Sequence, residues 1–273
     1  MLVELHCHST CSDGSLPPEA VAEMARARDV ALFALTDHDT CAGWDAVRSV
    51  LGDRAMRAVE LSCSDHGRTV HVLIYDVVGD DAGWAPVDAV MQRQVSARKK
   101  RLRNIVAKLE QRGIVLDADA ILAAGAGRVV GRPDVARALV AAGAVSDLDE
   151  AFRRFLRDGG PADVPVTTIS VEDGLALARK VGARASIAHP HTLGDDGRAR
   201  AERFRAAGLE GIEAGYGPYT RKERRRWVTL ADRLELVVTA GSDFHGETTP
   251  DIPTVGVDLD DARARTLLAW LGR

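Results

Sequence analysis

Short apolar runs alternate with stretches of helical periodicity along most of this chain. The alternation predicts parallel β-strands joined by crossover helices. We predict seven strands, at 3–7, 31–36, 57–62, 70–75, 185–188, 211–214 and 236–240. Helices are expected at 17–25, 171–181, 199–207 and 220–234. Pro17-Pro18-Glu19 marks the start of the first helix, because proline suits the first turn of a helix.

The segment 85–161 departs from this rhythm. It predicts four helices, at 87–112, 118–124, 132–142 and 147–157, without a strand of comparable strength between them. A helical insertion between the fourth and fifth strands is the simplest account. We therefore predict a discontinuous barrel domain, 1–84 and 162–273, and an insertion domain, 85–161.

The composition describes an ordinary water-soluble chain. Its 273 residues are 46% hydrophobic and carry a formal net charge of -4, which gives no general attraction for nucleic acid or membrane. No apolar run is long enough to cross a membrane, and the first residues do not resemble a signal peptide. The cysteines Cys7, Cys11, Cys41 and Cys63 lack zinc-finger spacing, and we interpret them as small buried hydrophobic residues. Free thiols fit a reducing cytoplasm, the expected location.

Histidines and carboxylates gather at the ends of the predicted strands. The first strand ends in His6-Cys7-His8, where both imidazoles share a face because alternate residues of a strand point the same way. Further strands end in or carry His38, Glu60, His71, His189, Asp243 and His245. In βα barrels the carboxyl ends of the strands carry the functional residues.

Imidazole together with carboxylate is a ligand set for zinc, manganese or iron. A single histidine in a βα loop is more often an ordinary polar residue, and His-x-His alone is a weak signal. The whole set makes coincidence improbable, and it is too large for one four-coordinate ion. Two or three cations sharing carboxylates would suit phosphoryl chemistry, because they activate water and neutralise phosphate oxygens.

The order of these motifs resembles the polymerase-and-histidinol-phosphatase (PHP) family of phosphoesterases. The resemblance lies in Glu4-Leu5-His6-Cys7-His8-Ser9-Thr10, Ser12-Asp13-Gly14, Thr36-Asp37-His38-Asp39, Glu60, His71, Ala188-His189-Pro190 and Gly241-Ser242-Asp243-Phe244-His245-Gly246. It covers nearly the whole chain. Closest in layout are stand-alone bacterial members that hydrolyse nucleoside 3',5'-bisphosphates or trim RNA 5' ends, and that carry a helical insertion after the fourth strand.

The resemblance implies a distorted (β/α)7 barrel with two or three divalent cations (Mn, Fe or Zn). One cation would be held by His6, His8, Glu60 and Asp243. Glu60 would bridge to a second, held also by His71 and His189. A third would be held by Asp13, His38 and His245. A metal-bound hydroxide would attack phosphorus and release an alcohol and inorganic phosphate, with Glu60, Asp243 and His189 as the catalytic residues.

Departures from the family pattern concern the substrate. Asp134 stands in Gly131-Arg132-Pro133-Asp134 where relatives usually have histidine, and His191 stands where glycine is common. Tyr216-Gly217-Pro218-Tyr219 replaces a frequent Tyr-His-Pro. Glu4 takes the place of an aspartate and is expected behind the ligands rather than among them. We predict that Arg132, Asp134 and His191 bind substrate, with the Arg132 guanidinium gripping phosphate.

The favoured activity is hydrolysis of a phosphate monoester of a small nucleotide- or sugar-like metabolite, a nucleoside 3',5'-bisphosphate above all. Cyclic phosphodiesterase, histidinol-phosphate phosphatase, RNA 5'-end exonuclease and a pathway-specific phosphatase of specialised metabolism stay open. A short RNA is the one nucleic acid partner considered, and the oligomeric state is left open. An amidohydrolase would usually place a lysine where this chain has Glu60. A metal-poor interaction module predicts missing ligands, and none is missing.

Overall fold

The computed structural model describes residues 1–157, 159–165 and 168–273. It divides into two compact units, unit 1 with residues 1–91 and 169–273 and unit 2 with residues 92–168. The predicted boundaries at 84 and 161 each lie seven residues earlier than these, at 91 and 168. Helix α3 (Asp81–Glu110) runs through the first boundary, so no break in periodicity marks it. That the two units are separate folding domains stays a prediction.

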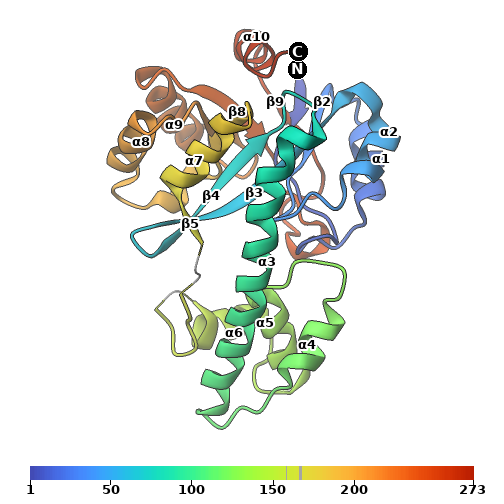
Figure 1. Ribbon diagram of the computed structural model, residues 1–273, viewed down its shortest axis with the longest axis vertical. Helices are drawn as coiled ribbons and strands as arrows, with labels where there is room; N and C mark the ends of the chain where they lie inside the picture. Colours follow the sequence, from blue (N-terminus) through green and yellow to red (C-terminus); the bar gives the residue numbers. More distant parts are fainter. Residues whose placement is uncertain (158, 166–167) are drawn as a thin grey trace. The chain divides into compact units, whose positions relative to one another are not determined.

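Unit 1 is built on one sheet (Figure 1). Its strands are β1 (Leu2–Glu4), β2 (Leu32–Leu35), β3 (Ala55–Asp65), β4 (Arg68–Tyr75), β5 (Ile169–Ser170), β6 (Arg184–Ile187), β7 (Gly211–Tyr216), β8 (Val237–Gly241) and β9 (Val257–Asp258). The order is β8-β7-β6-β4-β3-β2-β1-β9, with β5 paired to β3. The N–H of Leu5 donates to the carbonyl of Ala240 at 3.1 Å, so the segments after β1 and in β8 nearly close the sheet into a barrel. This confirms the predicted distorted barrel; β5 and β9, two residues each, were not predicted.

Strand β4 runs against the prediction of parallel strands. It pairs antiparallel with both β3 and β6, whereas β1, β2 and β3 are parallel to one another, as are β6, β7 and β8. The cause is the two-residue turn His66-Gly67, where both φ angles are positive (49° and 80°), as a tight hairpin requires. Because β4 is reversed, His71 near its start lies beside the carboxyl ends of the parallel strands. His66 is exposed, as predicted.

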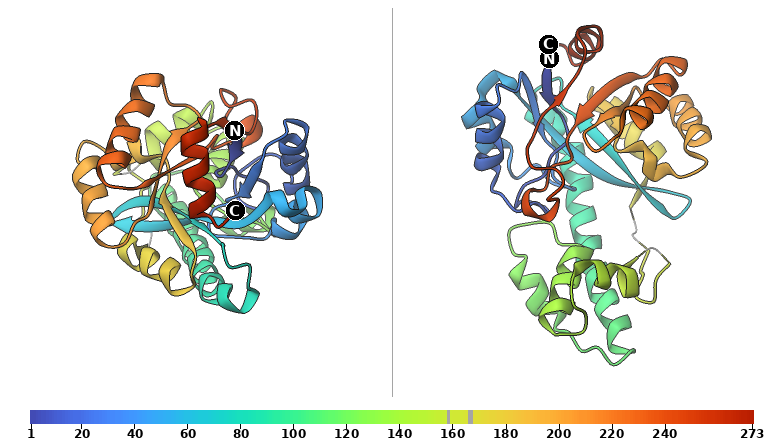
Figure 2. Two further views of the ribbon diagram at one scale, coloured as in Figure 1. Left: turned by 90° about the horizontal axis from the view of Figure 1, so that it is seen from above. Right: turned by 180° about the vertical axis from the view of Figure 1, so that it is seen from behind.

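Helices surround the sheet of unit 1 (Figure 2). They are α1 (Pro18–Ala27), α2 (Trp44–Leu51), α7 (Val171–Lys180), α8 (Gly197–Ala206), α9 (Arg221–Arg233) and α10 (Asp261–Trp270), with 3-10 turns η1 (Gly52–Arg54), η3 (Pro190–Leu193) and η4 (Gly246–Thr248). Helix α1 buries Val21, Ala22 and Ala25, one face of its turns, in a cluster with Phe33 and Cys7. Cys7 therefore points away from its neighbours His6 and His8. Helices α2 and α10 were not predicted.

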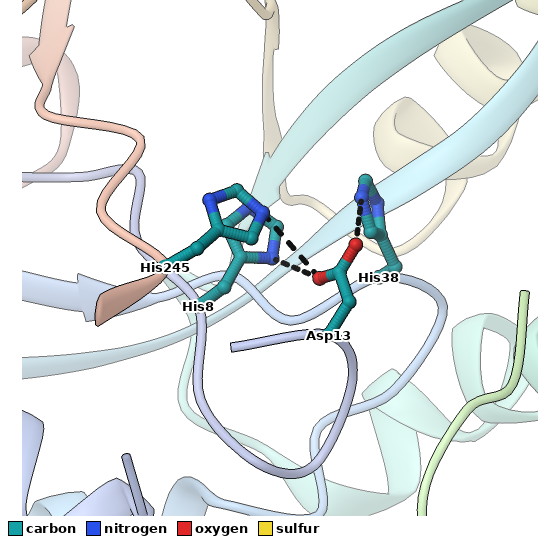
Figure 3. Close-up of side chains that lie close together, drawn as sticks. All are labelled: His8, Asp13, His38 and His245. Carbon is teal, nitrogen blue, oxygen red and sulfur yellow. Dashed lines mark ion pairs between the residues drawn. The ribbon is translucent and has the colours of Figure 1, made fainter. Parts of the chain in front are cut away.

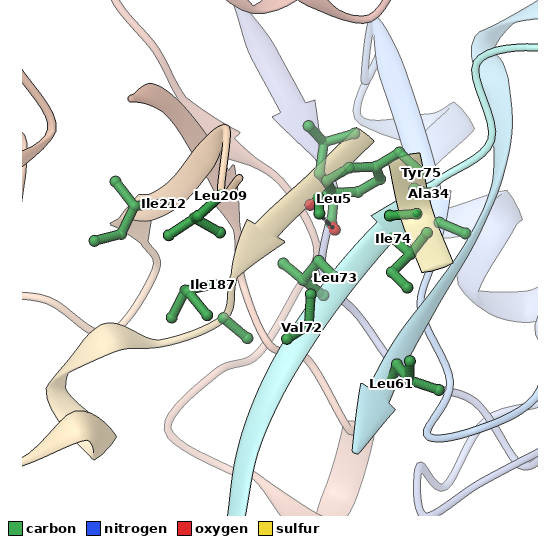
Figure 4. Packing of buried hydrophobic residues seen from close by; sticks show 14 of the residues in the cluster. Leu5, Ala34, Leu61, Val72, Leu73, Ile74, Tyr75, Ile187, Leu209 and Ile212 are labelled. Atoms are coloured by element: carbon green, nitrogen blue, oxygen red, sulfur yellow. Dashed lines mark hydrogen bonds between the residues drawn. The ribbon is translucent and has the colours of Figure 1, made fainter. Parts of the chain in front are cut away.

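The main core of unit 1 is apolar and lies on both faces of the sheet. Leu5, Leu61, Leu73, Tyr75 and Ile187 are fully buried in it (Figure 4). The Tyr75 hydroxyl donates to the carbonyl of Leu5 at 3.1 Å, which satisfies the polar end of this side chain inside the core. The packed interior gives a rigid base to the side chains that follow these strands.

Unit 2 is helical. Beyond the second part of α3 it contains α4 (Ala118–Ala124), α5 (Arg132–Ala141), α6 (Leu148–Ala151) and the π-helical turn η2 (Phe152–Leu156). Its own core includes Leu102, Ile105, Leu109, Leu139 and Leu156. The predicted helix 147–157 is thus two short elements. The helix predicted at 118–124 has the predicted bounds, and those predicted at 87–112 and 132–142 are found with shifted ends. Within the described ranges, no helix has the length and apolar character needed to cross a membrane.

Asp65 at the end of β3 is held by two arginines of α8. Its carboxylate accepts from Nε of Arg200 at 2.6 Å and also pairs with Arg203. Arg200 is buried, so Asp65→Ala would leave its guanidinium without its counter-charge. We expect this substitution to lower the free energy of unfolding by roughly 2–4 kcal/mol.

This loss should depend on pH. Burial raises the pKa of Asp65, but the hydrogen bonds from Arg203 and Arg200 outweigh it and hold the pKa below its usual range. The stabilisation is therefore complete above the ordinary carboxyl pKa of about 4 and is lost as the pH falls through the lowered pKa. Urea unfolding near neutral pH and near pH 3 measures it, with exposed Asp251→Ala as the control. A gap between wild type and variant that stays constant in acid would contradict the assignment.

Candidate metal centre

Glu60 in β3 lies fully buried among five imidazoles. The shortest distances between a carboxylate oxygen of Glu60 and a ring nitrogen are 3.0 Å for His71, 3.0 Å for His189, 3.3 Å for His6, 3.2 Å for His8 and 3.0 Å for His38. One oxygen, Oε1, faces His6, His71 and His189, and the other, Oε2, faces His8 and His38. A single carboxylate thus contacts two groups of histidines.

Asp243, just after β8, is a second carboxylate beside the His-x-His motif. Its Oδ1 lies 3.3 Å from Nε2 of His6 and 3.4 Å from Nε2 of His8. Its Oδ2 accepts a hydrogen bond from the Tyr216 hydroxyl at 2.9 Å. Both imidazoles of the motif therefore reach both Glu60 and Asp243, as the predicted shared face requires.

Asp13 supplies a third carboxylate from the loop after β1. Its Oδ1 lies 3.4 Å from Nε2 of His245 and 3.6 Å from Nδ1 of His8, and its Oδ2 lies 3.6 Å from Nε2 of His38. Figure 3 shows the Asp13 carboxylate pointing between the three rings. These residues come from three separate segments, which the barrel brings to one place.

The loop that carries Asp13 is folded by Asp37. The Asp37 carboxylate accepts from the N–H of Ser9 at 2.8 Å and from the hydroxyl of Ser12 at 2.5 Å. The loop also folds tightly onto the strand, because a Cβ on Gly14 would lie 2.8 Å from the carbonyl group of His8. Asp13 is placed by these contacts rather than by strand periodicity, so periodicity alone could not find it.

The two ends of the sheet meet beside the centre, where the segment after β1 contacts the segment after β8. The N–H of Asp243 donates to the carbonyl of His6 at 2.7 Å, and a Cβ on Gly241 would lie 2.3 Å from Cβ of His6. Asp243 and His189 have positive φ angles of 56° and 26°, which residues other than glycine rarely adopt. Such backbone outliers are often found at functional sites, where surrounding structure holds them.

Glu213 in β7 is a buried carboxylate that we did not predict. Its oxygens lie 2.9 and 3.0 Å from Nδ1 of His6, and one accepts from the N–H of His189 at 2.7 Å. A carboxylate behind a metal-binding imidazole fixes the orientation of the ring and leaves Nε2 for the cation. The available signal was a charged residue inside the apolar strand sequence Gly-Ile-Glu-Ala-Gly.

Glu4 also lies behind the centre, as we expected. It is fully buried and accepts from the N–H and the hydroxyl of Ser242 at 3.0 and 2.6 Å, and from the N–H of Gly256 at 2.6 Å. Burial raises the pKa of Glu4 to about 7 although these hydrogen bonds lower it. Glu4 thus holds Ser242, the residue just before Asp243, in place.

We expect Glu213→Gln to lower the affinity for the activating cation about 10- to 100-fold, because the neutral amide would place an NH2 donor where one of the two carboxylate oxygens faces Nδ1 of His6. Activity measured against cation concentration would show a shifted midpoint, with kcat largely restored at saturation. Glu210→Gln is the matched control, since Glu210 precedes the same strand and pairs with Arg184 instead. An unchanged midpoint would remove Glu213 from this role.

The protonation states of two side chains in the centre are those that metal ligands need. Burial raises the pKa of Glu60, but the charges of His71, His38 and His6 outweigh it and hold that pKa well below its usual range. Burial lowers the pKa of His71 to about 4. At neutral pH the carboxylate is therefore charged and this imidazole neutral, the forms in which both bind metals.

Divalent cations fit the residues present. In the described part of the chain, four buried atoms of the centre make no hydrogen bond although imidazole and carboxylate lie close together there: Nε2 of His6, Nε2 of His8, Nδ1 of His38 and Oε2 of Glu60. Each such atom costs about 1–3 kcal/mol unless a ligand satisfies it. Imidazole and carboxylate together are ligands for zinc, manganese and iron.

Four sets of side chains could each hold a cation, because within each set the ligand atoms lie within 4.8 Å of one another. The sets are His8, Asp13, His38 and His245; His6, Glu60 and His189; His6, His8 and Asp243; and His38, Glu60 and His71. All nine side chains predicted as ligands are among them. Their assignment to individual cations stays a prediction.

The three predicted substrate-binding residues lie in both units. In unit 1, the exposed His191 has its ring centroid 6.0 Å from that of His189. In unit 2, the buried Asp134 accepts from the N–H of Gly131 and from Arg137, both at 2.7 Å, and also pairs with Arg128.

Arg132 also has contacts inside unit 2. Its guanidinium donates to the carbonyl of Leu156 at 3.0 Å and lies 6.0 Å from the ring centre of Phe152. These contacts of Arg132 and Asp134 lie within unit 2. Substrate binding by these two residues and by His191 stays a prediction.

Known proteins resemble this chain over its whole length. It is 35% identical to a 3',5'-nucleoside bisphosphate phosphatase of Chromobacterium violaceum over 260 residues, which cover 92% of this chain and 90% of that protein. The chain belongs to the PHP family of metal-dependent phosphoesterases. It is also 34% identical over 248 residues to a 5'-3' exoribonuclease of Haemophilus influenzae, with 89% of each chain covered.

Comparison with solved structures supports the same family. A solved structure from Bifidobacterium adolescentis, assigned as a metal-dependent phosphoesterase, matches 99% of this PHP chain and 98% of its own, with a TM-score of 0.79 and 28% identity. No family model matches the chain, so its membership rests on these full-length similarities. They confirm the predicted family and the predicted enzyme class, a phosphoric ester hydrolase.

Proposed function

We propose that this PHP protein hydrolyses a phosphate monoester of a small nucleotide- or sugar-like metabolite, with nucleoside 3',5'-bisphosphates as the favoured substrates. The observation that carries the proposal is the placement of Glu60, whose two oxygens face two groups of imidazoles. Support for the nucleotide comes from the C. violaceum relative, which is a nucleoside bisphosphate phosphatase.

The residues of the centre would hold two or three divalent cations of manganese, iron or zinc. When bound, such cations activate a water and neutralise charge on the phosphate oxygens. Glu60 would join neighbouring cations through its two oxygens, and Glu213 would keep His6 turned toward them. Asp243, which accepts a hydrogen bond from the Tyr216 hydroxyl, would act together with His189 as a catalytic residue.

A second candidate is 5'-end trimming of a short RNA. The observation that favours it is the full-length similarity to the exoribonuclease of H. influenzae. The same cations could serve a diester, in which the attacked phosphate carries a second ester group, the rest of the RNA. The products therefore separate the two candidates: a monoester releases inorganic phosphate, and a diester releases a mononucleotide and a shortened RNA.

Hydrolysis of a panel of substrates tests the proposal, followed as release of inorganic phosphate from the monoesters, of mononucleotides from RNA and of the ring-opened monoester from the cyclic phosphate. The panel contains a nucleoside 3',5'-bisphosphate, a mononucleotide, histidinol phosphate, a sugar phosphate, a cyclic phosphate and a short 5'-phosphorylated RNA, each with manganese, iron or zinc. We expect the highest kcat/KM for the nucleoside bisphosphate. Preference for the RNA would establish the second candidate, and no release from any monoester would refute the first.

A further inference from the structure

Three aromatic side chains stand beside the metal centre, one in the segment after β6, one at the end of β7 and one in the loop that follows β7. The ring centroid of His191 lies 5.4 Å from those of both Tyr216 and Tyr219, and the two tyrosine rings are 4.9 Å apart. We call these three residues the aromatic wall. The rings of Tyr216 and Tyr219 are partly exposed and that of His191 is exposed, so the wall has surface left to offer a ligand.

The wall is joined to the predicted metal ligands. The Tyr216 hydroxyl donates to Oδ2 of Asp243 at 2.9 Å. The rings of Tyr216 and His191 each lie 6.0 Å, centroid to centroid, from the ring of His189. A group bound at the centre would therefore have the wall as a neighbour.

Hydrogen bonds fix the ring of His191. The Tyr219 oxygen accepts from the N–H of His191 at 3.0 Å and also lies 3.0 Å from Nδ1 of that ring. The Tyr219 hydroxyl thus contacts both the backbone and the ring of His191, which holds the two side chains together.

The composition of the chain makes the wall unusual. Aromatic residues are only 4% of the sequence, and there are three tyrosines. One of them, Tyr75, fills the core of the barrel, and the other two stand in the wall. Neither wall tyrosine is among the fully buried residues of the core, so packing alone does not account for them.

We propose that the aromatic wall receives the planar ring of the substrate's leaving group by stacking, and that this subsite gives the enzyme its preference for nucleosides over sugar or aliphatic phosphates. The inference rests on the proposed function, because it concerns the alcohol that hydrolysis releases. Stacking of a base on an aromatic side chain is worth about 1–3 kcal/mol, and about 1.4 kcal/mol corresponds to a tenfold change.

Tyr219 is the residue to change, because Tyr216 also holds Asp243. Tyr219→Leu removes the ring with a modest change of volume, whereas Tyr219→Phe keeps the ring and removes only the hydroxyl that contacts His191, so the pair separates stacking from that contact. With the cation-loaded protein, kcat and KM are measured for adenosine 3',5'-bisphosphate and for ribose 5-phosphate. Binding of adenosine, which has no phosphate, is followed by NMR titration as a readout independent of turnover.

We expect Tyr219→Leu to raise KM for the adenosine substrate about tenfold with ribose 5-phosphate little affected, and to weaken adenosine binding about tenfold. Tyr219→Phe, which keeps the ring, should lower the ratio of the two kcat/KM values less than Tyr219→Leu does. Equal losses on both substrates, or unchanged adenosine binding, would overturn the wall as a subsite. Absence of phosphate release by wild type would refute the proposed function instead, and the adenosine titration would still decide the wall.

Discussion

Glu60→Gln is expected to lower kcat by about 1000-fold or more, because several kcal/mol of cation-derived stabilisation of the transition state depend on this carboxylate. Glutamine has nearly the same shape but lacks the negative charge that faces the five imidazoles. The loss should appear in kcat rather than in KM alone, since the cations act on the reacting phosphate. Phosphate release at saturating substrate and cation measures it.

The fold of this variant should survive, because the substitution keeps the volume of a buried side chain. Circular dichroism and thermal unfolding check this point. Glu19→Gln is the control, an exposed carboxylate in the first turn of α1. A folded Glu60→Gln protein with near wild-type kcat would contradict the role of Glu60.

Removal of divalent cations is expected to abolish turnover and to lower stability at the same time. Among the described residues, the buried atoms of the centre that make no hydrogen bond within the protein would be left without a partner when the cation leaves. Binding at about 100 times the dissociation constant stabilises a folded protein by about 2.7 kcal/mol, so reloading should raise the melting temperature.

Activity and thermal unfolding of the chelator-treated enzyme, before and after addition of manganese, zinc or iron, measure both effects. Magnesium is a useful comparison, because its preference for oxygen ligands does not match a centre rich in imidazole. Full activity after exhaustive chelation would contradict metal dependence. A recovery of activity without a rise in melting temperature would contradict the expected stabilisation by the bound cation.

The barrel could be predicted because its strands are apolar runs separated by helical periodicity. All seven predicted strands are present. The reversal of β4 was missed, since the turn His66-Gly67 joins two strands whose side-chain pattern is the same in either direction. The boundary of unit 2 was displaced because α3 continues through it without a change in pattern.

The centre was predictable wherever a ligand follows a strand. His6, His8 and His38 stand at such ends, and the barrel brings them together. Asp13 came only from family resemblance, because hydrogen bonds within its loop place it. Glu213 was missed, since a second-layer carboxylate has no spacing motif and becomes visible only through its contact with His6.

The substrate side was least predictable. Asp134 was expected near phosphate, and the structure shows it bound to Arg128, Arg137 and the N–H of Gly131. Ion pairs between residues of one helix and its preceding loop depend on side-chain geometry that a linear motif does not contain. The aromatic wall likewise arises from segments at or after the ends of two different strands.

The central claim is that this protein is a phosphoesterase working through more than one cation at the Glu60 cluster. Stepwise reloading of the cation-free enzyme with manganese, with bound metal counted by mass spectrometry and phosphate release measured at each step, tests it directly. The account predicts two or three ions per chain, with turnover appearing only beyond the first equivalent. Full turnover with a single ion, or with none, would contradict it.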